Sequence, residues 1–222
     1  MALSKLTYNS LNVTAAASKG IGFDSDPDAL QADYTGGSLT FIKKLTASSS
    51  DTLSFVDGTS DVVLDNTYKE YLFTFKDIHP ETNQVSFGFQ GNAAGGSGYN
   101  ETMTTTFFQA AHSENDTALT APAYESGADQ AQGTGFQPIM RYLGNDNDQS
   151  GAGYLRLFNP SSTTYVKHFM SEIHHSHASD RVERDFVAGY FNTTSAIDEI
   201  QFKMSGNNID AGTFKLYGIK DS

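Results

Sequence analysis

Near its C-terminus the chain reads Ile197-Asp-Glu-Ile-Gln-Phe-Lys-Met-Ser-Gly-Asn-Asn-Ile-Asp-Ala-Gly-Thr-Phe-Lys-Leu-Tyr-Gly-Ile-Lys220. Apolar and polar residues alternate in two runs of this stretch, which predicts two strands with one buried face each. The apolar positions are Ile200, Phe202, Met204, Phe214 and Leu216. Glycine and asparagine between the runs favour a turn, because both tolerate positive φ. Strands patterned this regularly predict that the end of the chain closes a sheet.

Earlier parts of the sequence supply partners for that sheet. Runs rich in threonine, valine and aromatic residues alternate in the same way between turn-forming segments. We expect strands at 37–45, 52–56, 68–75, 84–90, 103–112, 151–158, 163–169 and 185–191. Successive strands are expected to form hairpins, whereas 91–98 and most of 113–132 are expected to be loop.

Two parts of the chain repeat the same order of features. Residues 37–56 and 151–169 each contain a glycine-led strand, a serine-rich turn and a second strand. Two similar four-strand halves predict an all-β, antiparallel β-sandwich, jelly-roll-like in its connections. The chain has 222 residues, a length that one such domain can fill.

We assign residues 36–222 to a single sandwich domain and residues 1–35 to an N-terminal arm with one short strand. The arm includes small or uncharged residues suited to docking on a neighbouring subunit. The residues that we expect to form this assembly arm are Val13, Ala15, Ala16 and Ala17.

Composition argues against several classes of protein. The formal net charge is −12 with 14 lysine and arginine residues, whereas nucleic-acid binding depends on clustered cations. Cysteine is absent, so thiolate metal sites and disulfides are excluded. No apolar run approaches the roughly 20 residues needed to span a membrane, and the N-terminus lacks the apolar core of a signal peptide. We expect a soluble protein without membrane insertion or nucleic-acid binding.

Four histidines form the densest group of chemically active side chains: His168, His174, His175 and His177. In an extended segment His175 and His177 would lie on one side, and imidazole is the commonest metal ligand. Copies of this pair around a three-fold axis would surround an ion. The alternative, which we adopt, is a solvated loop. We therefore predict no bound metal and no cofactor, with His174, His175 and His177 as the candidates if this is wrong.

Other motifs suggest ordinary turns. The aspartate-rich runs 24–28 and 145–148 resemble calcium loops, but Ala29 and Thr35 in the first and Leu157 in the second replace residues that such a loop needs. A Gly-x-Ser-x-Gly motif is absent, and the carboxylates are too scattered to indicate an acid and a base. We predict no catalytic residues and a protein that is not an enzyme.

Four stretches carry a resemblance to known proteins: 36–50 with its Gly-Gly-Ser-Leu-Thr-Phe start, 66–73, 77–80 and 209–219. Together they resemble the structural proteins of tailed phages, especially phages of marine bacteria including cyanobacteria. The resemblance covers most of residues 11–219. Its most specific part is the final Gly212-Thr-Phe-Lys-Leu-Tyr-Gly-Ile219 strand.

The resemblance implies a virion structural protein made in the host cytoplasm and displayed on the particle surface. Its partners would be major capsid or tail proteins and further copies of itself, in a trimer or dimer. The chain lacks the heptads of a fibre shaft, so we favour a capsid decoration protein over a compact tail-fibre or receptor-contacting module. A carbohydrate-binding or depolymerising domain is the alternative of another class, with a host-surface glycan stacked on Tyr99 and Tyr124.

Overall fold

The computed structural model describes residues 22–23, 30–31 and 38–221. The chain separates into two compact units, residues 1–37 and 38–222. In the first, β1 (Gly22–Phe23) pairs with β2 (Leu30–Gln31) in antiparallel fashion. The proposed arm residues Val13, Ala15, Ala16 and Ala17, and the 24–28 run, lie outside the described residues.

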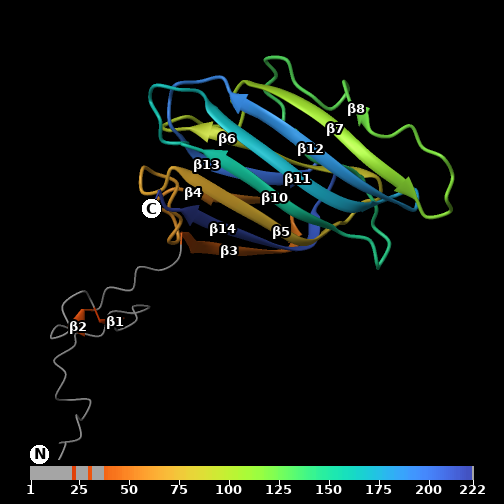
Figure 1. The fold of residues 1–222 in the computed structure, drawn as a ribbon, viewed down its shortest axis with the longest axis horizontal. Helices are drawn as coiled ribbons and strands as arrows, with labels where there is room; N and C mark the ends of the chain where they lie inside the picture. Colours follow the sequence, from red (N-terminus) through yellow and green to blue (C-terminus); the bar gives the residue numbers. More distant parts are fainter. Residues whose placement is uncertain (1–21, 24–29, 32–37, 222) are drawn as a thin grey trace, which may run out of the picture. The chain divides into compact units, whose positions relative to one another are not determined.

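Residues 38–221 form a 12-stranded antiparallel sheet (Figure 1). Its strands are β3 (Leu39–Ser50), β4 (Thr52–Val56), β5 (Glu70–Pro80), β6 (Val85–Ala93), β7 (Met103–Ser113), β8 (Ala123–Tyr124), β9 (Gln137–Leu143), β10 (Gly151–Phe158), β11 (Lys167–His177), β12 (Arg181–Phe191), β13 (Ile197–Met204) and β14 (Ile209–Ile219). In this part of the chain, no helix is long and apolar enough to cross a membrane. The expectation of an all-β antiparallel fold is confirmed.

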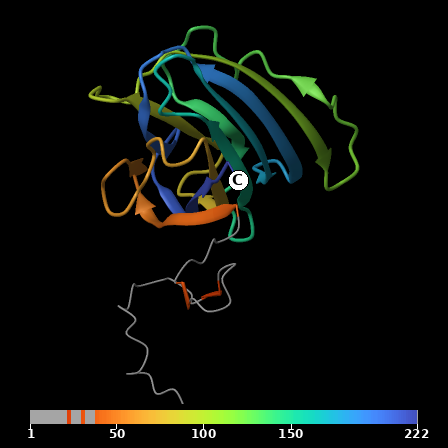
Figure 2. The same cartoon turned by 60° about the vertical axis from the view of Figure 1, so that its left-hand side comes forward.

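Nine strands form one path, in the order β3-β14-β5-β10-β11-β9-β6-β13-β4. Its two end strands, β3 and β4, are consecutive in the sequence, so the sheet curls back on itself and is nearly closed (Figure 2). The remaining strands extend from β11, which pairs with β12, which pairs with β7 and then β8. The expected sandwich of two separate sheets is therefore replaced by one barrel-like sheet.

The core lies between two walls of this sheet. One wall contains β3, β14, β5, β10, β11, β12 and β7, which run side by side in Figure 1; the other contains β9, β6, β13 and β4. Phenylalanines from the two walls meet: Phe75 with Phe87 (ring centroids 5.4 Å apart) and Phe169 with Phe89 (5.0 Å). Fully burying such side chains contributes about 1.5–3 kcal/mol each, so this aromatic interior holds the walls together.

The final strands do close the sheet, but not as a pair. β13 pairs with β6 and β4, whereas β14 pairs with β5 and β3 on the opposite wall. Where the described unit begins and ends, the Lys220 N–H donates to the Ser38 carbonyl at 2.9 Å. This contact brings the two ends of the unit together on neighbouring strands, the edge strand β3 and its partner β14.

Most of the predicted hairpin pairings do not form. The segments predicted as hairpins 37–56 and 68–90 each cross from one wall to the other. The predicted hairpin 151–169 does form, as β10 with β11, and β11 continues into a further hairpin with β12. The two predicted halves are therefore not structural repeats. Alternation reports which side chains face the core, but it does not identify the neighbouring strand.

Three segments also differ from expectation. β9 lies where no strand was predicted, and β11 and β12 extend through the supposed histidine loop to a turn at Ala178–Asp180. The 91–98 loop begins later, because β6 continues to Ala93. Gly91 is buried there, and a Cβ at this position would lie 2.8 Å from the Phe191 ring, so the strand needs glycine at this point.

Candidate functional site

The predicted histidines lie on one strand, β11, and are divided between its two faces. His175 and His177 point inward, with 2% and 3% of their surface exposed, whereas His168 and His174 point outward. The expectation that His175 and His177 share a side is confirmed, and the solvated loop is wrong. Because both rings are buried within one chain, they cannot join copies around a symmetry axis.

The hairpin register brings acidic residues to these histidines. His175 lies opposite Glu183 and His177 opposite Arg181, while Asp185 is two residues further along β12. Glu183 and Asp185 are fully buried. We call His175, His177, Arg181, Glu183 and Asp185, together with Arg141 of β9, the buried polar cluster.

This cluster lies where the sheet branches, since β11 pairs with β9 at His177 and Leu143 as well as with β10 and β12. The Arg141 backbone is bound there by side chains. Its N–H donates to Asp185 Oδ2 at 3.1 Å, and its carbonyl lies 2.6 Å from His175 Nε2. Two buried side chains thus satisfy a backbone segment at an irregular point of the β6–β9 pairing.

Burial controls the charges of the cluster. It lowers the pKa of His175 to about 4, despite the hydrogen bond to the Arg141 carbonyl. Burial, together with Arg181 and Arg141, lowers the pKa of His177 to about 4. Burial and the neighbouring Glu183 raise the pKa of Asp185 to about 8. At neutral pH both imidazoles are therefore neutral, and Asp185 holds a proton.

Several buried polar atoms of the cluster have no partner: His175 Nδ1, Arg181 Nε, Glu183 Oε2 and Asp185 Oδ1. Glu183 Oε1 forms an ion pair with Arg181 at 2.5 Å. His175 Nδ1 is 3.7 Å from Asp185 Oδ2, and His175 Nε2 is 3.6 Å from Glu183 Oε2. One ligand atom from each of His175, Glu183 and Asp185 lies within 4.8 Å of the other two. These three residues are the described ones that can hold a metal ion.

A second feature is the outer surface of the same wall, formed by outward side chains of β10, β11, β12, β7 and β8. Phe108 and Phe186 stack with ring centroids 4.7 Å apart and planes inclined by 7°. Register places Tyr124 next to Phe108 and Glu172 next to Phe186. We call this surface the outer face; it combines exposed rings with the Glu172–Arg184 ion pair.

The outer face is hollowed beside this aromatic pair. A depression of about 500 Å³ is lined by Phe158, His168, Met170 and Tyr190, with the small residues Ala188 and Gly189 between them. A second, of about 170 Å³, adjoins it beside Tyr154 and Phe186. The combined size suits part of a sugar or peptide, since ligand pockets span about 300–1,000 Å³.

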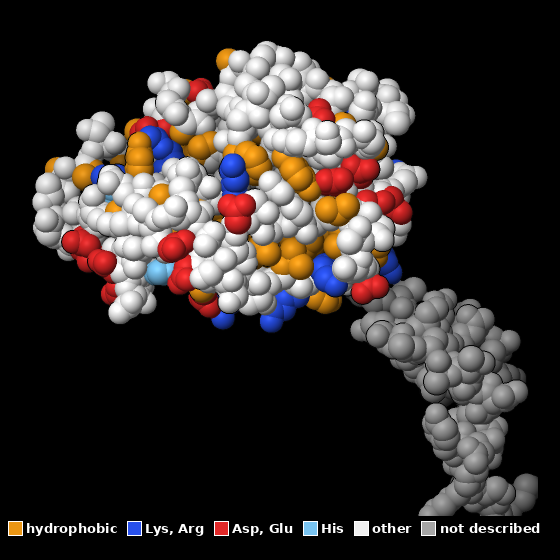
Figure 3. Space-filling model, turned by 180° about the vertical axis from the view of Figure 1, so that it is seen from behind, with side chains coloured by type: hydrophobic (Ala, Val, Ile, Leu, Met, Phe, Trp, Pro, Cys, Tyr) orange, Lys and Arg blue, Asp and Glu red, His pale blue; other side chains and the backbone are white. Residues whose placement is uncertain are grey.

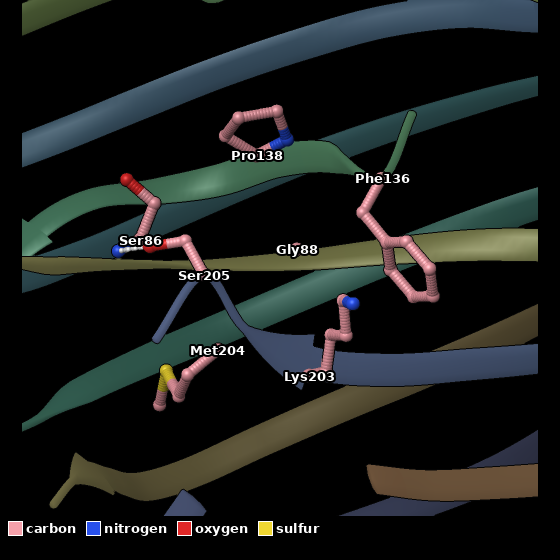
Figure 4. Close-up of a pocket in the computed structure, with 7 residues that line it drawn as sticks. All are labelled: Ser86, Gly88, Phe136, Pro138, Lys203, Met204 and Ser205. Atoms are coloured by element: carbon pink, nitrogen blue, oxygen red, sulfur yellow. Dashed lines mark hydrogen bonds between the residues drawn. The ribbon is translucent and has the colours of Figure 1, made fainter. Parts of the chain in front are cut away.

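A hollow on the opposite side of the molecule is much smaller. Figure 3 shows that side from behind, with hydrophobic side chains lying among acidic, basic and uncharged polar ones. The hollow lies between Ser86, Phe136 and Lys203 (Figure 4). Its volume is about 40 Å³, little more than the roughly 30 Å³ that one water molecule occupies in the liquid. This hollow does not suit an organic ligand.

The remaining candidates have separate positions. Tyr124 is 57% exposed beside the outer face, whereas Tyr99 is half-buried. The 145–148 run forms the expected turn, closed by a hydrogen bond from the Gln149 N–H to the Asp146 carbonyl at 2.9 Å. These residues do not join the buried polar cluster.

The sequence interpretation missed Glu183 and Asp185. A signal existed, because Arg181, Glu183 and Asp185 alternate just after a turn and so face one side of a returning strand. Comparison with known protein families, curated proteins and solved structures finds no match to this chain.

Proposed function

We propose that this chain is a non-enzymatic structural protein of a tailed-phage virion, displayed on the particle as a capsid decoration protein. The proposal rests on the position, within the fold, of the stretches that resemble phage structural proteins. The stretches at 36–50, 66–73, 77–80 and 209–219 include all of β3, the start and end of β5, and all of β14. These three strands are direct neighbours, with β14 in the middle. Segments far apart in sequence thus resemble phage proteins over one contiguous part of the fold.

The exposed apolar side chains support a role in assembly. Six large hydrophobic residues on the wall that contains β3, β14, β5, β10, β11, β12 and β7, or on the adjoining β8, are more than one-third exposed. They are Leu39, Phe41, Phe108, Tyr124, Met170 and Val182. Phe41 belongs to a row that continues through its register partner Tyr217 and then Leu72 on β5. Exposed apolar surface of this kind marks contacts with other proteins. We expect it to contact capsid proteins, with the chain present as a trimer or dimer.

Cryo-electron microscopy of virions that carry the chain tests the proposal. Copies on icosahedral symmetry axes are expected, whereas copies at six-fold or twelve-fold positions near the portal would indicate the tail-fibre alternative. A variant with Phe108→Ser and Phe186→Ser is expected to fold but to be lost from purified particles. Its matched control is Phe136→Ser with Lys203→Ser on the opposite side. Equal incorporation of both variants would contradict a role for the outer face.

The hollows of the outer face favour carbohydrate binding as a second candidate. Tyr190 and His168 flank the larger one with ring centroids 5.8 Å apart, and Thr104 and Thr106 supply hydroxyl groups. Aromatic rings can stack on a sugar ring, and neighbouring hydroxyl groups can form hydrogen bonds with its hydroxyls, so this hollow suits a sugar. A glycan array distinguishes the candidates. Glycan binding that is lost in Tyr190→Ala and kept in Tyr165→Ala would support carbohydrate binding at this hollow. An array without hits would exclude the carbohydrate-binding function.

A further inference from the structure

We propose that His175, Glu183 and Asp185 bind one divalent first-row transition metal ion inside the sheet. Each residue offers a ligand atom, these atoms lie within 4.8 Å of one another, and all three side chains are buried. This departs from our expectation that the chain holds no metal. The site lies within one chain, so it does not depend on the assembly role proposed above.

The orientation of the His175 ring is that of a metal ligand. Its Nε2 is 2.6 Å from the Arg141 carbonyl oxygen, which can only accept, so Nε2 carries the proton. Neutral imidazole then has a free lone pair on Nδ1, and this buried atom has no partner. Metal-ligating histidines commonly donate their other N–H to a backbone carbonyl, which fixes the tautomer. Arg141 performs that function here.

The two carboxylates are also only partly satisfied. Asp185 accepts from the Arg141 N–H through Oδ2, while Oδ1 has no partner. Arg181 forms an ion pair with Glu183 Oε1 at 2.5 Å, whereas Glu183 Oε2 has no partner. Buried, unsatisfied carboxylate oxygens are costly, and either a proton or a cation relieves that cost.

The charges around the site leave room for a cation. Three carboxylates, Glu125, Glu183 and Asp185, face the guanidinium groups of Arg141 and Arg181. Three carboxylates against two guanidinium groups leave one carboxylate without a cationic partner. A divalent ion between His175, Glu183 and Asp185 would supply that partner at short range.

The donor set indicates the class of metal. One imidazole and two carboxylates, without a thiolate, suit zinc, manganese or ferrous iron, whereas magnesium keeps most of its water. Bonds of about 2.0–2.2 Å place ligands about 3.4 Å apart, so an ion would draw the carboxylates inward. His177 is not a ligand, because its Nδ1 accepts from the Ser179 N–H at 2.9 Å and its Nε2 faces Arg181.

The test uses the full chain, unfolded with chelator and refolded with or without Zn²⁺ or Co²⁺, because a buried site fills most readily during folding. Glu183→Gln and Asp185→Asn remove ligand charge with little change in shape. His174→Ala is the matched control, since His174 lies on the same strand and points outward. Metal content by elemental analysis, cobalt absorption and the ¹⁵N resonances of the imidazoles are measured.

We expect one zinc per wild-type chain, a higher Tm with zinc, and a shift of the His175 Nδ1 resonance that His174 does not show. Glu183→Gln and Asp185→Asn should bind at least about 100-fold more weakly, while His174→Ala binds normally. The proposal is overturned if folded wild-type protein takes up no ion at millimolar concentration or if the His175 resonance does not move. Those two measurements decide the question even if the buried variants fail to fold.

Discussion

Phe75 on β5 packs edge-on against Phe202 on β13, with ring centroids 5.1 Å apart and planes inclined by 71°. The two residues belong to opposite walls of the sheet, so this contact spans the core. Phe202 also meets five other phenylalanines, namely Phe55, Phe73, Phe87, Phe89 and Phe214. It therefore lies at the centre of the aromatic interior.

Phe202→Ala should lower the free energy of unfolding by about 3–5 kcal/mol, because it removes buried surface and leaves a cavity between rigid walls. Urea unfolding with the midpoint and slope both fitted measures this change. Tyr165→Ala, at a residue 69% exposed, should change stability by less than about 0.5 kcal/mol. Equal losses in the two variants would contradict the central position of Phe202.

Gly91→Ala should destabilise the fold by about 1–3 kcal/mol through overpacking. The added Cβ would lie 2.8 Å from Phe191 and 3.1 Å from Ile197, both in the core. Gly127→Ala is the control, because a Cβ there meets no atom within 4 Å. Thermal unfolding of the two variants side by side checks the prediction, and a Gly91 variant as stable as wild type would refute it.

Gln90→Leu should make the segment before β9, residues 94–136, more accessible to proteolysis. Gln90 is fully buried, and its Nε2 donates to the carbonyls of Glu101, Thr134 and Gly135 at 3.0–3.1 Å. Leucine removes the donor to the Glu101 and Thr134 carbonyls, at a cost of about 1–3 kcal/mol, whereas the Gly135 carbonyl still accepts from Gln130 Nε2 at 3.0 Å. Limited proteolysis should cut faster between residues 94 and 136. Gln132→Leu, on an exposed side chain, should leave both the cleavage rate and stability near wild type.

Stability of the metal-free protein should be greatest near pH 6.5. Asp185 has a pKa of about 8 in the fold against an ordinary 3.8, so the native state holds an extra proton between these values and its stability falls as pH rises from 3.8 to 8. Above pH 6.5, where the histidines are neutral in both states, nothing from the histidines opposes this fall. Glu183, whose pKa burial raises, acts in the same direction. His175 and His177, with pKa values of about 4 against 6.5, lose stability as pH falls from 6.5 to 4.

Chemical unfolding in chelator across pH 4–9 measures this profile. Asp185→Asn should flatten its alkaline side, because no proton is then released on that limb. Arg181 and Arg141 face His177, and Arg141 and Glu125 face Asp185. A wild-type profile that rises steadily to pH 8 would contradict the burial of Asp185 as a neutral acid.

Much of the fold was predictable because burial leaves a mark on alternate residues. The inward positions of β5, β13 and β14 agree with the sequence pattern. Strand neighbours were not predictable in this way, since a chain that crosses between walls at Asp51 has the same pattern as a hairpin. β9 was missed because Pro138 and Arg141 interrupt its apolar residues, and its order depends on distant partners such as Asp185.

The buried polar cluster shows the same limit. His175 and His177 were identified as candidates from their spacing, but their burial was not predicted, because histidine, glutamate and aspartate ordinarily mark solvent-exposed segments. Only the β11–β12 register, with a turn of three residues, brings Glu183 opposite His175.

The hydrogen bond between Lys220 and Ser38 has a consequence for engineering. Because the two ends of the unit meet on paired strands β3 and β14, a short peptide can join them without disturbing the core. Circular permutants with new ends in the exposed 115–122 segment should fold, and the whole unit should tolerate insertion into a surface loop of an unrelated carrier protein.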